Sequence, residues 1–289
     1  MSEAVDTGGS RIHDIGYRRY EGTNLGRLYV ARSLYTHGLR SAFGLGRSAK
    51  AKIFPWIMVG LLGAFAVVVA AVRAQTGEMI VGYQEFQQVA RVIVIIFLAV
   101  VAPELVSRDL RNKTLPLYFS RPLRRTDYAL AKLAAVISAV FLLVAGPLTI
   151  VGAAAAFSVA DVSGVWAEVR GLLGGYTMIA VLAVIHGSIA LLIASLASKR
   201  AFAAGAIAAV FLVLVPIAQI PHELAHGAIG QLSLMISPDG MVDGLQEFLF
   251  GKGDANLEPG YRIYYGVGAV ALVAAVVTAL ITRYRKVSL

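Results

Sequence analysis

The sequence predicts an all-α, polytopic membrane protein with six transmembrane helices. Hydrophobic residues make up 58% of its 289 positions and charged residues only 15%, whereas a soluble domain carries roughly 25% charged residues. Six apolar runs are close to the length of about 20 residues that a helix needs to cross the hydrocarbon core. These runs are residues 53–72, 89–106, 128–157, 172–197, 201–220 and 263–282.

The first 52 residues precede these runs, and we expect them to form a separate region from the six-span domain at 53–289. Between Asn24 and Lys52, leucines and tyrosines recur at near-helical spacing with arginines between them. A basic amphipathic helix of this kind lies in the headgroup plane of a membrane, with its apolar side in lipid. Residues 1–52 are therefore predicted to be a cytoplasmic tail with an amphipathic interface helix.

Basic residues gather in the segments on one side of the six spans. These segments are the N-terminal region, the connection between the second and third spans, the turn with Lys199 and Arg200, and the residues from Arg283 onward. Lysine and arginine in short loops stay on the cytoplasmic side. We therefore expect a bacterial plasma-membrane protein with both termini in the cytoplasm. The net charge of +9 follows from this distribution and does not indicate nucleic-acid binding.

The connection between the second and third spans, residues 106–127, contains most of the functional candidates. Apart from the N-terminal region, it is the one polar segment on the cytoplasmic side long enough to fold and to be bound by a partner. Arginines at helix ends also bind lipid phosphates, so these residues are topology anchors in a competing interpretation. The candidates for partner contact are Arg108, Asp109, Arg111, Asn112, Lys113, Thr114, Leu115, Arg121, Pro122, Arg124 and Arg125.

The segment 219–261 is the only long extracytoplasmic connection in this topology. Apolar residues lie on both sides of the turn sequence Ser237-Pro238-Asp239-Gly240, and Pro, Asp and Gly together favour a chain reversal. We expect two short amphipathic helices joined by this turn. They would form a re-entrant helical hairpin in the outer leaflet before the last span.

Glu104, His186 and Gln219 are polar side chains within or beside the predicted spans. An ionisable side chain inside a membrane is costly and is usually paired. We therefore expect Glu104 to pair with Arg108, four residues further along the same helix, and His186 to be hydrogen-bonded inside the bundle. In the competing interpretation, all three side chains lie along a transport path.

Residues His222 to His226 match the motif H-E-x-x-H. On a helix, two histidines at this spacing share one face and can bind zinc, with Glu223 as general base. This motif predicts an alternative function as a zinc intramembrane metalloprotease. The simpler interpretation is a polar loop without metal, because Pro221 places His222 at a helix start.

An ordered pattern runs through the 106–132 segment, with an acidic residue, Thr-Leu, an apolar residue, a proline, a basic residue and a distant lysine. The residues in this pattern are Asp109, Thr114, Leu115, Leu117, Pro122, Arg125 and Lys132. Together with the six-span architecture, it resembles the membrane subunit of type-2 ATP-binding-cassette exporters. The opening segment RIHDIGYRRYEGTNLG, residues 11–26, is similar to the leader of actinobacterial members.

The resemblance implies a permease that forms the translocation path as a dimer, with a second copy or a sister permease, among membrane lipids. Two separate ATPase subunits would bind beneath it. Residues 106–127 would form the coupling helix, which would sit in a cleft of the ATPase. No G-x-x-x-x-G-K-[ST] phosphate-binding loop occurs in the sequence, so ATP and Mg²⁺ would bind to the partner. We thus expect no catalytic residue and no cofactor in this chain. A third interpretation is a non-transporting membrane assembly factor.

Overall fold

The computed structural model describes residues 22, 26–111, 123–159, 161–197 and 199–286, and these residues contain helices but no strand. Six helices are long and apolar enough to cross a membrane. They are α2 (Ala49–Thr76), α3 (Phe86–Arg111), α5 (Arg125–Ser158), α6 (Val162–Leu196), α7 (Arg200–Leu224) and α10 (Arg262–Lys286). The prediction of an all-α chain with six spans is confirmed, and the length and composition of these helices make it a multi-pass membrane protein.

Each span extends beyond the apolar run that predicts it, and α6 extends furthest. This helix has 35 residues and begins at Val162, because the carboxylate of Asp161 accepts a hydrogen bond from the Gly164 amide at 3.0 Å. An aspartate in this position satisfies an amide at the helix start that has no partner within the helix. At about 1.5 Å per residue, α6 is longer than the hydrocarbon core, which is about 30 Å thick. Part of it therefore projects from the membrane.

Four shorter helical segments occur among the described residues. They are α1 (Arg27–Ala42), α8 (Gly227–Ser233), the 3₁₀ turn η1 (Leu234–Ile236) and α9 (Pro238–Phe250). Helix α9 starts with a proline in its first turn, and the Ser237 hydroxyl accepts a hydrogen bond from the Gly240 amide at 2.9 Å. It ends at Gly251, whose positive φ of 68° is readily adopted by glycine. Two locations stay predictions: that of α1 in the headgroup plane and that of α8 and α9 in the outer leaflet.

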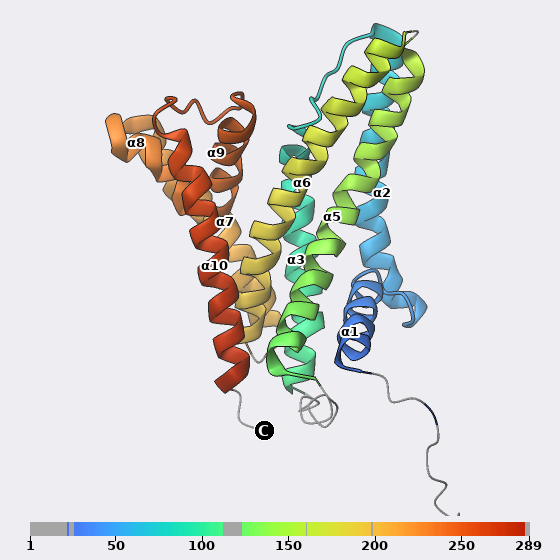
Figure 1. Ribbon diagram of the computed structural model, residues 1–289, viewed down its shortest axis with the longest axis vertical. Helices are drawn as coiled ribbons and strands as arrows, with labels where there is room; N and C mark the ends of the chain where they lie inside the picture. The colour runs from blue at the N-terminus through green and yellow to red at the C-terminus, as the bar shows by residue number, and fades with distance from the viewer. Residues whose placement is uncertain (1–21, 23–25, 112–122, 160, 198, 287–289) are drawn as a thin grey trace, which may run out of the picture.

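The long helices form two groups that diverge along the molecule (Figure 1). Helices α2, α3, α5 and α6 lie together, and α1 packs mainly against α5. Helices α7 and α10 lie against this group, α7 on α3 and α10 on α6 and α5. The starts of α1, α5 and α7 and the end of α10 lie at one end of the bundle, which we call the basic end. Helices α8 and α9 lie toward the opposite end, the α9 end.

Candidate functional site

The edges of the predicted coupling region, residues 106–127, lie at the basic end (Figure 1). Helix α3 continues to Arg111 and α5 begins at Arg125, so the region is helical at both edges. Among the candidates, the side chains of Arg124 and Arg125 belong to the described part of the chain. The candidates outside the described residues are Asn112, Lys113, Thr114, Leu115, Arg121 and Pro122, and the side chains of Arg108, Asp109 and Arg111 are outside them as well.

The start of α5 is joined to α1 by a bidentate ion pair. Arg27 Nε and Nη2 donate to the two carboxylate oxygens of Asp127, each at 2.5 Å. Asp127 also accepts a hydrogen bond from the backbone amide of Arg124 at 3.1 Å, where a carboxylate is favoured by the helix dipole. The parallel arrangement of two N–H···O bonds is the most specific form of an arginine–carboxylate contact. The predicted interface helix and the predicted coupling region therefore meet through Arg27 and Asp127.

A buried lysine joins α5 to the last turns of α3. Lys132 is only 4% exposed, and its Nζ donates to the backbone oxygen of Leu105 at 2.8 Å. The ammonium also lies 5.4 Å from the centre of the Tyr128 ring, a favourable cation–π arrangement. The two helices that flank residues 112–122 in the sequence, α3 and α5, are thus joined directly at the basic end.

Helix α10 also contacts the start of α5. The Tyr128 ring meets the Tyr284 ring edge-on, with 5.2 Å between ring centres. Arg125 Nη1 donates to the backbone oxygen of Arg285 at 2.6 Å. The start of α5 therefore contacts α1, α3 and α10 within its first few residues.

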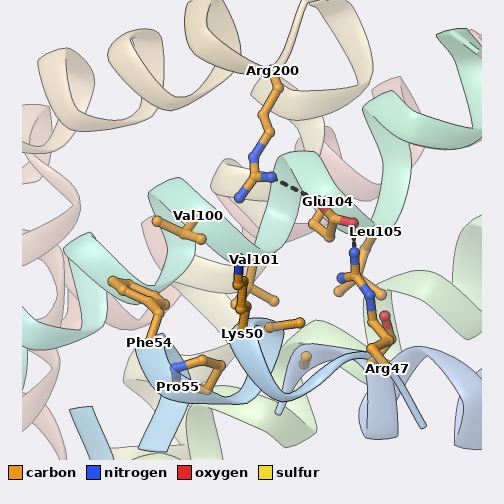
Figure 2. Close-up of a pocket in the computed structure, with 12 residues that line it drawn as sticks. Arg47, Lys50, Phe54, Pro55, Val100, Val101, Glu104, Leu105 and Arg200 are labelled. Carbon is orange, nitrogen blue, oxygen red and sulfur yellow. Dashed lines mark ion pairs between the residues drawn. The ribbon is translucent and has the colours of Figure 1, made fainter. Parts of the chain in front are cut away.

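Two arginines from distant parts of the chain bind Glu104 near the basic end of α3. Arg47 Nη2 lies 2.6 Å from Oε1, and Arg200 Nη1 lies 3.0 Å from Oε2 (Figure 2). Arg47 belongs to the connection between α1 and α2, and Arg200 is the first residue of α7. The expected partner Arg108 lies among the side chains outside the described part, so the Glu104–Arg108 pair stays a prediction.

His186 is fully buried on α6 and is hydrogen-bonded, as the sequence predicts. Its Nε2 lies 2.9 Å from Oδ1 of Asp239 on α9. Its ring stacks on Phe211 of α7, with 4.7 Å between ring centres. The histidine therefore connects three helices in the interior.

Arg91 of α3 extends this contact into a network with two of the acidic residues of α9, Asp239 and Asp243. Its guanidinium forms a bidentate ion pair with Asp243, with Nη1 at 2.8 Å from Oδ2, and its Nε lies 3.8 Å from Asp239. We call Arg91, His186, Asp239 and Asp243 the α9 network. Burial raises the pKa of Asp239, but the hydrogen bond and charge of His186 and the charge of Arg91 outweigh burial and hold this pKa below its ordinary value.

A second cluster joins the end of α2 to the start of α6. Arg73 Nη2 lies 2.5 Å from Oε1 of Glu168, and the Tyr83 hydroxyl donates to Oε2 at 2.5 Å. Burial, together with the hydrogen bond to the Glu168 carboxylate, raises the pKa of Tyr83 well above its ordinary value. The phenol therefore remains a donor, and the cluster connects α2, α6 and the segment between α2 and α3.

The three side chains considered for a transport path have separate environments. Glu104 is ion-paired at the basic end, His186 is buried against α9, and Gln219 is exposed on α7. The structure does not bring them together. Sequence reasoning missed Arg91, Asp239 and Asp243 as a group. A charged residue inside an apolar run was the available signal for Arg91, because such a residue is usually paired.

The H-E-x-x-H motif does not form one helical face. Helix α7 ends at Leu224, and His226 is in extended conformation, with φ −98° and ψ 159°, before α8 begins. His222 Nδ1 is instead within 3.0 Å of the backbone oxygen of Gly230. In the described part of the chain, no three His, Cys, Asp or Glu side chains are arranged to hold a metal ion. The helical geometry on which the zinc hypothesis rests is therefore wrong, because the helix ends between the two histidines.

Comparisons with known proteins do not assign the chain to a family: no family model matches it, and no curated protein matches it.

Proposed function

We propose that this chain is the permease subunit of an ATP-driven exporter of the bacterial plasma membrane, with both termini in the cytoplasm. The observation that carries the proposal is the set of contacts at the basic end between the helices that flank residues 112–122 in the sequence. Arg27 with Asp127, and Lys132 with the Leu105 carbonyl, join α1, α3 and α5 at that point. A partner that moved this segment would move three helices together.

The two contacts at the basic end, Arg27 with Asp127 and Lys132 with the Leu105 carbonyl, differ in strength, which suits a mechanical coupling. Lys132 is buried, so its bond to the end of α3 is shielded from water. Arg27 and Arg124 are exposed, and exposed ion pairs are weak and exchange readily. In the proposed mechanism, a partner ATPase binds the exposed arginines when it closes on ATP and Mg²⁺. The buried lysine then transmits the displacement to α3 and α5.

The exposed apolar faces of the spans support a dimer embedded in lipid. In the most apolar stretch of each helix, only 28%, 22% and 22% of the residues of α2, α7 and α10 are buried inside the protein. The corresponding share is 56% to 61% for α3, α5 and α6. Helix α7 exposes Gly205, Ala206 and Ala209 near its start. Small residues allow helix backbones to approach closely in a membrane, so we place a second copy, or a sister permease, against α7.

The test is ATP turnover by the chain together with the ATPase that co-purifies with it from its own host. Reconstituted in phospholipid vesicles, the pair should hydrolyse ATP at a rate that depends on this chain. The double substitution Arg121→Glu and Arg124→Glu should lower turnover by at least roughly tenfold, because like charges across an interface cost several kcal/mol.

Lys252→Glu is the matched control, since Lys252 is an exposed cation beyond α9. It should leave turnover unchanged. Wild-type turnover in the Arg121/Arg124 variant, with the complex intact, would remove the coupling role of residues 106–127. Absence of any ATP-binding-cassette ATPase from the purified complex would remove the permease proposal itself.

A further inference from the structure

A cavity of about 300 Å³ lies at the basic end, between the α1–α2 connection, α2, α3 and the start of α7. One part of its wall is apolar and includes Phe54, Pro55, Val100, Val101 and Leu105. Its charged lining residues are Arg47, Lys50, Glu104 and Arg200. Figure 2 shows Phe54, Pro55 and Val100 toward one side, and Glu104 with Arg47 toward the other. The cavity is therefore amphipathic.

The charged part of the lining is net positive. Three cationic side chains share a single carboxylate, because Arg47 and Arg200 both bind Glu104. Figure 2 shows the two arginines reaching Glu104 from opposite sides. Lys50 forms no ion pair with any side chain in the described part of the protein. An anion that enters the cavity would therefore meet an uncompensated lysine and two arginines that share one carboxylate.

Two long helices begin at this cavity. Lys50 and Ala51 belong to the first turn of α2, and Arg200 is the first residue of α7. Neither helix start has a side-chain cap hydrogen bond. The Ala51 amide donates to the Ser48 carbonyl at 3.0 Å, so the amides that remain for a ligand are those before it in α2 and those in the first turn of α7. Amides and dipole at a helix start both favour a negatively charged group, which adds to the attraction by the side chains.

We propose that this cavity binds the phosphate headgroup of an anionic phospholipid from the leaflet at the basic end. The phosphate contacts Lys50 and the helix starts, while the glycerol and first acyl carbons pack against Phe54, Pro55 and Val100. A free phosphate ion has the same charge chemistry but leaves the apolar wall unfilled. The inference does not depend on the proposed permease function, because it concerns this chain in any membrane that contains anionic lipid.

The test is a titration of the full-length protein in neutral detergent, with thermal unfolding followed by tryptophan fluorescence. The probes are dioctanoyl phosphatidylglycerol, dioctanoyl phosphatidylcholine and inorganic phosphate at matched concentrations. Phosphatidylglycerol should raise the melting temperature in a saturable way, because a ligand that binds only the folded state stabilises it. Phosphatidylcholine and phosphate should have no comparable effect. An equal shift from either of them would overturn the proposal.

Side-chain variants locate the site. Lys50→Gln and Arg200→Gln should each weaken phosphatidylglycerol binding roughly fivefold, the effect expected of one basic residue near an anionic headgroup. Lys50→Arg should keep the affinity, and Lys252→Gln, which removes an exposed cation at the α9 end, should not change it. Lys50 is exposed and has no ion-pair partner in the described part of the chain, so its substitution does not disturb folding. Unchanged affinity in Lys50→Gln would overturn the assignment of this cavity.

Discussion

The basic end and the α9 network use the same residue types at very different exposures. At the basic end, the side chains of Arg27 and Arg200 are 44% and 53% exposed. In the α9 network, His186 is fully buried and the side chain of Asp239 is 9% exposed. Exposed ion pairs contribute about 0–1 kcal/mol, whereas removal of one member of a buried pair costs about 3–5 kcal/mol. The ion pairs of the α9 network thus contribute more to stability than the exposed arginine pairs at the basic end, where Lys132 is the buried charge contact among the described side chains.

This difference separates a fixed part of the molecule from one that can rearrange. The contacts of Arg27, Arg47 and Arg200 lie where water or a partner can replace them at little cost. The α9 network is less open to replacement, because His186 is fully buried and the side chains of Arg91 and Asp243 are only 18% and 14% exposed. A partner that binds at the basic end therefore acts on the half of the structure whose charge contacts are easiest to exchange.

The largest effect is expected from Asp239→Ala. It leaves the buried His186 without its Nε2 contact and removes one of the two carboxylates near Arg91. We expect the free energy of unfolding to fall by about 3–5 kcal/mol, measured by thermal or denaturant unfolding in detergent. Asp254→Ala, at an exposed aspartate beyond α9, is the control. Similar losses in the two variants would contradict the view that the α9 end is held by buried charge.

A smaller loss is expected from Gly244→Ala, which tests whether packing also fixes the α9 end. A Cβ atom at Gly244 would overlap the ring of Tyr265 on α10. This ring cannot turn away without cost, because it is buried and its hydroxyl donates to the Gln231 carbonyl at 2.6 Å. Overpacking of this kind costs about 1–3 kcal/mol.

The matched control for that substitution is Gly60→Ala on α2. No atom lies within 4 Å of the added Cβ at Gly60, so alanine should be neutral or stabilise the helix by up to about 1 kcal/mol. Unfolding of both variants in one detergent gives the comparison. A Gly244→Ala protein as stable as Gly60→Ala would mean that α9 and α10 separate easily.

The six spans could be predicted because each contains enough consecutive apolar residues to cross a membrane. Their ends could not, because they depend on local capping. Asp161 starts α6 well before its apolar run begins, and residues 162–171 are too polar to extend that run. The end of α7 at Leu224 was equally hidden, although it decides that His222 and His226 do not share a helix.

The ion pairs were harder to predict than the helices, because their members are distant in sequence. Spacing along one helix suggested Arg108 for Glu104, and that pair stays a prediction. Spacing could not show that the packing of α3 against the α1–α2 connection and α7 also brings Arg47 and Arg200 to Glu104. For His186, a hydrogen bond was predicted because a buried polar group without a partner destabilises a helix bundle. It did not identify Asp239, which comes from the loop helix α9.

A loss of about 1 kcal/mol is expected from Lys132→Met, which tests a buried cation that joins α3 and α5 at the basic end. Methionine keeps most of the side-chain volume and removes the bond to the Leu105 carbonyl, a typical net loss for a hydrogen bond. In the reconstituted complex, this variant should also lower the ATP turnover that depends on this chain. Lys252→Met is the control for both measurements. A Lys132→Met protein with full coupling would show that α3 and α5 do not need this bond to move together.

The smallest effect is expected from Arg27→Ala, which breaks the exposed pair with Asp127. Asp127 keeps its hydrogen bond from the Arg124 amide, so the start of α5 stays capped, and the melting temperature should fall less than in the three variants above. In about 1 M salt, where the Debye length is about 3 Å, wild type and variant should melt at nearly the same temperature, whereas the loss in Asp239→Ala should persist because its partners are buried. Melting curves of both variants at low and high salt give this comparison. A salt-independent loss in Arg27→Ala would show that the Arg27–Asp127 contact is more than a screened ion pair, and the distinction between the ion pairs of the two ends would then fail.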